Sequence, residues 1–153
     1  MANLYFEELE IGIRSTVGPY RFSKDEIIGF ATQYDPIPRH MDEHAAAQSV
    51  FGGLTASGSH TFAVYIRLSS QLQPHFQVLM GLGWDELKLL NPVRPGDELD
   101  LEMTVLEMRE SKSKPDWGIV RNRNELRNQK RETVLQCIST IFVARRPGAT
   151  TAS

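Results

Sequence analysis

The sequence predicts a single α+β domain, with helices in its first half and an antiparallel sheet in its second. Helix signals follow one another between residues 23 and 72, and four runs with partial apolar–polar alternation fill residues 78–144. Helices and strands do not alternate along the chain, which argues against a parallel sheet. With 153 residues, one domain at 1–146 is expected, followed by a small, polar and flexible tail at 147–153.

The first helix is expected to begin at Ser23. Ser23-Lys24-Asp25-Glu26 has the form of a capping box, in which the serine hydroxyl accepts the amide of Glu26 and the glutamate side chain returns to the serine amide. Apolar residues continue the helix to about Gln33. Asp35-Pro36-Ile37-Pro38 then predicts a stiff extended loop, because each proline disfavours a helical conformation of the residue before it.

Two further helices are predicted before the sheet. Asp42 is placed to cap a short helix over Glu43 to Gln48, and Phe51-Gly52-Gly53 interrupts the chain again. A longer helix is expected from about Ser57. Its apolar residues lie on more than one face, which indicates a buried helix.

The predicted strands are residues 78–90, 98–110, 117–127 and 133–144. Asn91 to Asp97, rich in proline and glycine, is interpreted as the turn between the first two strands. Residues 111–116 and 128–132 supply the other turns. We therefore expect a four-stranded antiparallel meander with a central helix across one face.

Charge and composition exclude few functions. The net charge is -2 and the pI is about 6.1, so neither a nucleic-acid nor a membrane partner is expected. Basic residues gather between Arg121 and Arg131, which we interpret as a solvated strand and turn. A partial docking surface for a phosphorylated ligand is the alternative interpretation.

Cysteine use and the first residues predict a cytoplasmic protein. The single cysteine, Cys137, allows no disulfide within the chain, and its apolar neighbours predict a buried, inert thiol. No apolar stretch approaches the length of a transmembrane helix. Residues 1–8 lack the basic and apolar regions of a signal peptide.

Asp35 and His40 are candidates for general acid–base chemistry. A carboxylate and an imidazole on one proline-stiffened loop can share a water molecule, one group accepting a proton while the other donates one. The alternative is structural: Asp35 caps a turn, and His40 is a satisfied polar group near a helix start.

A zinc motif overlaps the same histidine. His40-Met41-Asp42-Glu43-His44 matches the H-x-x-E-H pattern of inverted zinc peptidases, which needs both histidines on one helical face. Pro38 and the predicted cap at Asp42 place His40 outside the helix of His44. We therefore predict no metal here.

Ser57-Gly58, at the start of the long helix, is a candidate oxyanion site. The first amides of a helix lack intrahelical partners and lie at the positive end of its dipole, so they can hold a developing negative charge on a thioester oxygen. The alternative is that Gly58 serves only a tight turn. His60, inside the same helix, is expected to be packed and not catalytic.

The order of these segments resembles the MaoC-like dehydratases, the hot-dog (R)-specific enoyl-CoA hydratases. The resemblance runs from about Tyr5 to Ala144 and is carried by residues 34–43, 51–61, 81–87 and 91–97. It implies an antiparallel sheet wrapped around a long helix, a homodimer or larger assembly, and coenzyme A thioesters as substrates without metal or redox cofactor. By position, Asp35 and His40 match the family's catalytic pair, and Gly58 matches the glycine whose amide receives the thioester carbonyl.

Three positions depart from the family pattern. Ile37 stands where many members have an asparagine, Ser57 where many have a histidine, and Arg39 places a cation beside His40. The predicted activity is reversible hydration of a trans-2-enoyl-CoA to an (R)-3-hydroxyacyl-CoA. An acyl-CoA thioesterase and a non-catalytic acyl-CoA-binding subunit are the alternatives, and the acyl chain is left open.

Overall fold

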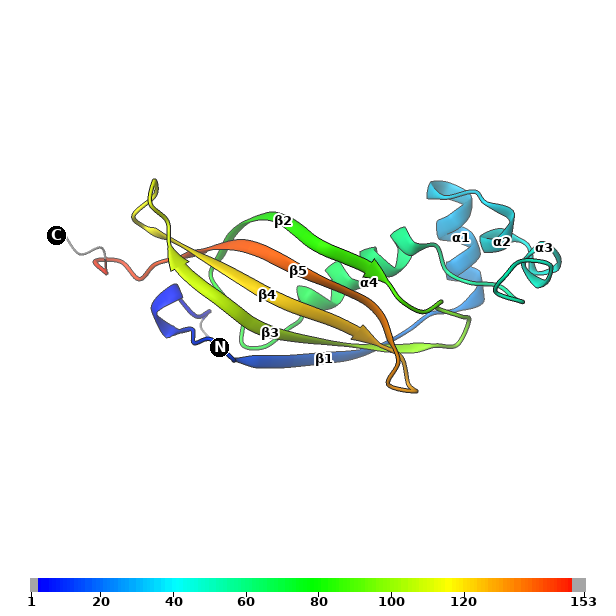
Figure 1. Ribbon diagram of the computed structural model, residues 1–153, viewed down its shortest axis with the longest axis horizontal. Helices are drawn as coiled ribbons and strands as arrows, with labels where there is room; N and C mark the ends of the chain where they lie inside the picture. Colours follow the sequence, from blue (N-terminus) through cyan, green and yellow to red (C-terminus); the bar gives the residue numbers. More distant parts are fainter. Residues whose placement is uncertain (1–2, 150–153) are drawn as a thin grey trace.

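A twelve-residue helix, α4 (Gly58–Ser69), lies along the inner face of a five-stranded antiparallel sheet in the computed structural model, which describes residues 3–149 (Figure 1). The strand order is β1-β3-β4-β5-β2. The strands are β1 (Arg14–Arg21), β2 (Val78–Leu89), β3 (Glu98–Glu110), β4 (Trp117–Arg127) and β5 (Thr133–Ala144). This is the sheet wrapped around a helix that the family resemblance implies.

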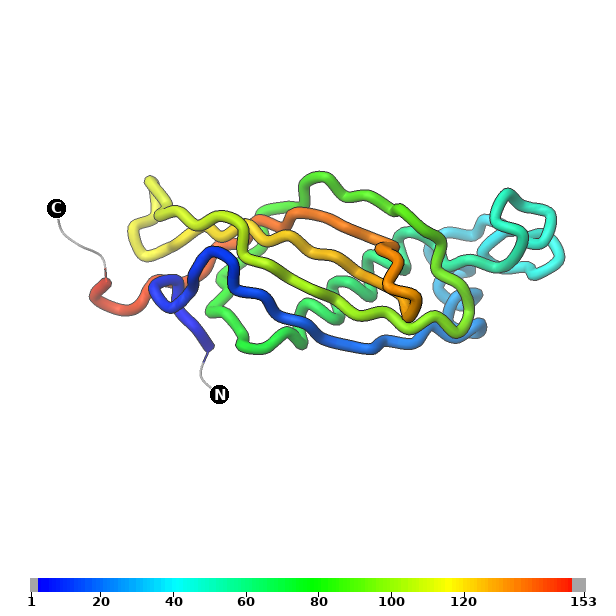
Figure 2. The backbone as a smooth tube through the Cα atoms, turned by 60° about the horizontal axis from the view of Figure 1, so that its bottom comes forward, coloured from blue at the N-terminus to red at the C-terminus, as the bar shows by residue number. Residues whose placement is uncertain are grey.

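The remaining helices gather beyond one end of the sheet. They are α1 (Lys24–Tyr34), α2 (Pro38–Met41) and α3 (Glu43–Ala47). Figures 1 and 2 show them beside the N-terminal end of α4, whereas η1 (Phe6–Glu8) lies at the opposite end of the sheet. The loops that carry the candidate residues therefore meet the start of α4.

The predicted helix caps are confirmed in part. The Ser23 hydroxyl accepts the Glu26 amide at 3.1 Å, and Asp42 accepts the amides of His44 and Ala45 at 2.8 and 3.2 Å. The predicted return bond, from the Ser23 amide to the Glu26 side chain, is wrong. The Glu26 carboxylate instead accepts the Tyr20 hydroxyl and contacts Nε2 of His60. The buried imidazole needs a protein partner, whereas the exposed Ser23 amide can bond to water.

β1 was not predicted from the sequence. Gly18-Pro19 interrupts its pattern and resembles a turn signal, and the strand's register shifts between Val17 and Tyr20. An edge strand tolerates such a proline because one side of it makes no ladder. Gly18 itself has φ +135° and lies against Asp100, so this bulge has no room for a side chain.

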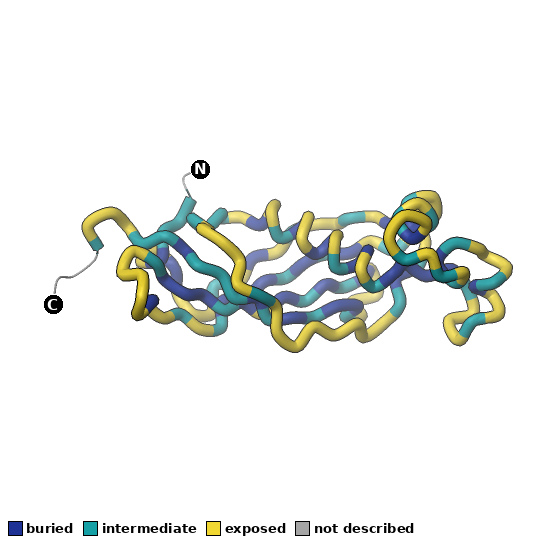
Figure 3. The backbone as a smooth tube through the Cα atoms, turned by 90° about the horizontal axis from the view of Figure 1, so that it is seen from above, coloured by how far each residue is buried: buried dark blue, intermediate teal, exposed yellow. Residues whose placement is uncertain are grey.

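The predicted four-stranded meander is wrong in its first connection. Only β3, β4 and β5 form a meander; β2 pairs with β5 and is an edge strand. Residues 91–97 therefore connect opposite parts of the sheet instead of closing a hairpin, and the buried side chain of Val93 anchors them. Figure 3 shows most of β2 exposed.

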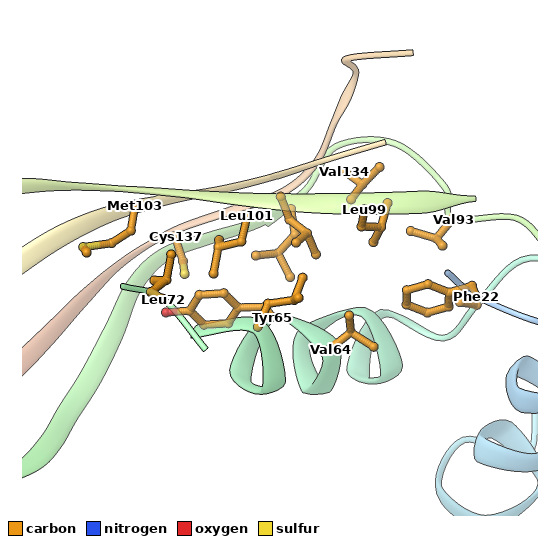
Figure 4. Packing of buried hydrophobic residues seen from close by; sticks show 14 of the residues in the cluster. Phe22, Val64, Tyr65, Leu72, Val93, Leu99, Leu101, Met103, Val134 and Cys137 are labelled. Atoms are coloured by element: carbon orange, nitrogen blue, oxygen red, sulfur yellow. The ribbon is translucent and has the colours of Figure 1, made fainter. Parts of the chain in front are cut away.

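The core fills the space between α4 and the sheet. Val64, Tyr65 and Leu68 of α4 are buried against inward side chains of β3 and β5, including Leu101 and Cys137 (Figure 4). The buried thiol confirms the interpretation of Cys137.

The predicted flexible tail stays a prediction. The Ala149 amide bonds to the Arg146 carbonyl in a turn, and residues 150–153 lie outside the described residues.

Phe22 offers a test of this core. Its side chain is fully buried and packs against His60 and Tyr20, with ring centroids 4.6 and 5.5 Å away. We expect Phe22→Ala to lower the free energy of unfolding by about 3–5 kcal/mol in chemical denaturation. Ile11→Ala, at a residue 66% exposed, should change it by less than about 0.5 kcal/mol. Equal effects of the two substitutions would contradict the packing.

Candidate active site

Backbone hydrogen bonds fix the loop that carries Asp35 and His40. Asp35 ends α1, where its amide bonds to Ala31, and the Ile37 amide bonds back to the Asp35 carbonyl at 2.7 Å. Pro38 then opens α2, and the His40 amide bonds to the Ile37 carbonyl at 2.9 Å. Ile37 therefore braces the loop through its backbone.

The tautomer of His40 follows from one hydrogen bond. His40 is 4% exposed, and its Nδ1 lies 2.6 Å from the carbonyl oxygen of Thr55. A carbonyl only accepts, so Nδ1 carries a proton and donates it. In the neutral ring Nε2 then has a free lone pair. This nitrogen lies 3.7 Å from Oδ2 of Asp35.

Asp35 is held by the segment that leads into α4. The Ser57 hydroxyl donates to Asp35 Oδ2 at 2.6 Å, and because its proton is used there, it accepts the Ser59 hydroxyl at 2.7 Å. The 3.7 Å between Asp35 and His40 Nε2 is too long for a direct hydrogen bond. The spacing suits two groups that hold one water molecule between them.

Gly58 lies close to β2. It is the first residue of α4, and a Cβ placed there would lie 2.4 Å from Cδ1 of Leu89, so the end of that leucine side chain would have to move. Its φ lies outside the left-handed region, so the backbone itself does not demand glycine, and the tight-turn interpretation is not supported. As the first residue of the helix, Gly58 has an amide without an intrahelical partner.

An open cavity of about 260 Å³ brings the predicted residues together. Asp35, His40 and Gly58 line it. Ser57 is not among the lining residues, and its hydroxyl donates a hydrogen bond to Asp35. Arg39 also lines the cavity, and its Nε is buried without a hydrogen-bond partner among the described residues. The other lining residues are Phe51, Thr55, Ala56, Thr61, Leu89, Leu90, Asn91, Pro92 and Val93.

The geometry does not support the zinc motif. His40 lies in α2 and His44 in α3, with Asp42 ending one helix and capping the other, so the histidines do not share a helical face. Within residues 3–149 no group of three or more His, Cys, Asp or Glu side chains is arranged to hold a metal ion.

None of the described helices is long and apolar enough to cross a bilayer.

A second cluster, centred on buried His60, lies between α1 and α4. His60 is 3% exposed, contacts Glu26 at 2.8 Å and stacks on Phe30 at 4.5 Å between ring centroids. Burial lowers the pKa of His60, although Glu26 opposes the shift. Burial and the Glu26 carboxylate raise the pKa of Tyr20 to about 12. The packed state expected for His60 is found, and the cluster holds α1 against α4.

Two features of the site had no clear sequence signal. The Thr55 carbonyl that orients His40 is a backbone group fifteen residues away, and nothing in a sequence marks such a contact. Leu89 reaches Gly58 only because β2 runs alongside α4. Ser59 had a weak signal, since a second serine beside a cap residue can support it.

Comparisons with known proteins decide the family. A family described as MaoC like domain matches residues 11–126, which is about three quarters of the chain. The chain belongs to the MaoC-like dehydratase family. Its antiparallel sheet around α4 is the hot-dog fold, as predicted.

Two solved structures resemble the MaoC-like chain over nearly its whole length, and a further relative resembles it in sequence over about two thirds. The MaoC-like dehydratase from Rhodospirillum rubrum is 43% identical with a TM-score of 0.89, covering 95% of this chain and 99% of that one. The R-hydratase PhaJ1 from Pseudomonas aeruginosa is 25% identical with a TM-score of 0.76, covering 94% and 88%. The 3-hydroxybutyryl-CoA dehydratase of Methylorubrum extorquens is 32% identical over 107 residues, 69% of this chain and 66% of that protein.

The lowered pKa of His60 predicts a pH dependence of stability. The folded chain binds fewer protons at this ring than the unfolded chain, so this contribution is present above about pH 6.5 and is lost as the pH falls. The free energy of unfolding should therefore decrease from about pH 7 to about pH 5. His60→Gln should reduce that decrease, and His44→Gln, at an exposed ring, should leave it unchanged. An unaltered pH dependence in the first variant would contradict the assignment.

Proposed function

We propose that this protein hydrates a trans-2-enoyl-CoA thioester reversibly to an (R)-3-hydroxyacyl-CoA. The observation that carries the proposal is the pair formed by His40 Nε2 and Asp35 Oδ2, 3.7 Å apart in the same cavity as the free amide of Gly58. The pair can hold a water molecule, and the amide can receive a thioester oxygen.

The proposed step follows from the tautomer of His40. Neutral Nε2 accepts a proton from the water held with Asp35 while the water oxygen bonds to C3 of the enoyl group. The electron pair of the double bond moves toward the thioester oxygen, where the Gly58 amide and the dipole of α4 stabilise the charge. The imidazolium, beside the Asp35 carboxylate, then returns its proton to C2. Water adds without any other reactant.

The named relatives support this reaction class. One is described as a 3-hydroxybutyryl-CoA dehydratase and another as an R-hydratase. Thioester hydrolysis would instead require water at the carbonyl carbon and release of free coenzyme A. The described relatives favour hydration over hydrolysis, and a binding subunit would not need His40 held in one tautomer.

We also propose that β2 pairs with β2 of a second copy. β2 is an edge strand whose large apolar side chains are between 45% and 56% exposed. β2 also contains charged residues and three register shifts, but its run of exposed large apolar side chains has no counterpart on the other edge, β1. Antiparallel pairing of identical strands about a two-fold axis covers these exposed apolar side chains.

Isosteric substitutions test the catalytic pair. Asp35→Asn and His40→Asn should each lower kcat for hydration of crotonyl-CoA by roughly 10²–10⁴-fold, measured as loss of the conjugated double bond. Asparagine keeps a donor for the Thr55 carbonyl, so the loop should remain folded. His44→Asn, at an exposed histidine in α3, is the matched control and should retain full turnover. Turnover of both site variants within about twofold of the original would remove the pair from the mechanism.

A charge on the edge strand tests the proposed dimer. Leu82 lies near the middle of β2 and is 49% exposed, so Leu82→Asp brings two like charges together across a two-fold axis. We expect a dimer for the original chain and a monomer for this variant in sedimentation velocity. Ile11→Asp, at another exposed apolar residue, should remain dimeric. A monomeric original chain would refute the pairing.

A further inference from the structure

Arg39 places a permanent positive charge in the wall of the catalytic cavity. It precedes His40 in α2 and lines the same cavity of about 260 Å³ as Asp35 and Gly58. An arginine side chain is not deprotonated in proteins. Apart from His40, which titrates, the other ionisable side chain in the lining is Asp35. Among the described residues Arg39 is therefore the one permanent cation that lines this cavity.

The acids near Arg39 in sequence are engaged elsewhere. Asp35 accepts a serine hydroxyl at 2.6 Å, Asp42 accepts two backbone amides of α3, and Glu43 pairs with a lysine at 2.8 Å. Within residues 3–149 the Arg39 side chain forms no hydrogen bond and no ion pair. The described part of the chain therefore supplies no anion for this cation.

The terminal nitrogens of Arg39 are accessible. Arg39 is half-buried, and of its side-chain nitrogens only Nε is both fully buried and unpaired. Because Nη1 and Nη2 also lack partners within the described residues, their absence from the buried atoms means that they reach open space. A guanidinium binds a planar carboxylate through two parallel hydrogen bonds. The accessible end of Arg39 can therefore receive an anion from outside the chain.

The place of Arg39 selects among the anions that a coenzyme A thioester can carry. The proposed reaction places the thioester oxygen at the Gly58 amide and C3 of the enoyl group at the water held by Asp35 and His40, and these residues share one cavity with Arg39. The phosphates of coenzyme A lie at the far end of the long, uncharged pantetheine arm. A cavity of about 260 Å³ suits a short acyl group. An anion that meets Arg39 there belongs to the acyl group.

The proposed reaction itself favours an anion at Arg39. His40 becomes an imidazolium during the step, and a neighbouring cation disfavours that charged form. The Asp35 carboxylate offsets only one of these two positive charges, so the cavity carries a net positive charge while the proton is held. A substrate carboxylate at Arg39 brings the sum to zero. We therefore expect such a carboxylate to assist proton transfer as well as binding.

We propose that Arg39 binds a carboxylate on the enoyl group, and that the preferred substrates are coenzyme A monothioesters of short unsaturated dicarboxylic acids. This inference rests on the proposed hydration of trans-2-enoyl-CoA thioesters and adds the class of acyl group. Arg39 is then a specificity-determining residue, because an alkyl terminus leaves its charge without a partner. The product is a 3-hydroxyacyl-CoA that keeps the carboxylate, and water is the only other reactant.

The test compares matched pairs of trans-2-enoyl-CoA thioesters that carry either a carboxylate or the isosteric, uncharged carboxamide on C3, C4 or C5. At the position that reaches Arg39, kcat/KM should favour the carboxylate by about 10–100-fold, the effect of hydrogen bonds between charged groups. Arg39→Met should bring this ratio to about one, and Arg39→Lys, which keeps the charge but loses the planar fork, should retain part of the preference.

Arg109→Met is the matched control. Arg109 is exposed near the C-terminal end of β3, which lies at the opposite end of the sheet from α2 (Figure 1). Its side chain forms no ion pair within residues 3–149, so this variant removes an equal charge far from the cavity and should keep the preference for the carboxylate. Each ratio compares two substrates on the same enzyme, so a partial loss of folded protein cancels.

Equal turnover of carboxylate and carboxamide by the original chain at every position would overturn the inference while leaving hydration intact. A loss of kcat/KM in Arg39→Met that is equal for both members of a pair would assign Arg39 to the phosphates of coenzyme A, and would also overturn it. Failure of the original chain to hydrate any of these thioesters, crotonyl-CoA included, would refute the proposed function and the inference with it.

Discussion

The side chains of Asp35 and His40 are both tied to the short segment that leads into α4. His40 donates to the Thr55 carbonyl at 2.6 Å, and Asp35 accepts the Ser57 hydroxyl at 2.6 Å. These two bonds select the tautomer of the imidazole, aim the carboxylate and place both beside the Gly58 amide. Buried polar contacts of this kind keep their geometry because breaking one leaves an unpaired group. The sheet and the Glu26–His60 contact contribute by holding α1 and α4 in place.

The local parts of this arrangement could be predicted from sequence, and the long-range parts could not. The caps at Ser23 and Asp42 depend on residues within a few positions, so their hydrogen bonds follow from spacing. Asp35 and His40 could be named from a proline-rich loop, but their relation to Thr55 depends on packing. β1 was missed because Gly18-Pro19 breaks its pattern, and β2 was given the wrong neighbour because a turn-like sequence does not show which strand follows it in the sheet.

The departures from the family pattern acquire physical meaning in the structure. Ile37 leaves the loop braced by backbone bonds, and Ser57 becomes a partner of Asp35 instead of facing the cavity. Arg39 lines the cavity with its Nε unpaired among the described residues, a charge that an anionic part of a thioester substrate can complement.

The central claim is that the water held by Asp35 and His40 adds to C3 of the enoyl group and does not attack the thioester carbonyl. Turnover of crotonyl-CoA in water labelled with a heavy oxygen isotope, followed by mass spectrometry of the products, tests it directly. We predict one labelled oxygen in the 3-hydroxyl group of an intact (R)-3-hydroxybutyryl-CoA. Label in a free carboxylate, together with released coenzyme A, would contradict it and assign the site to hydrolysis.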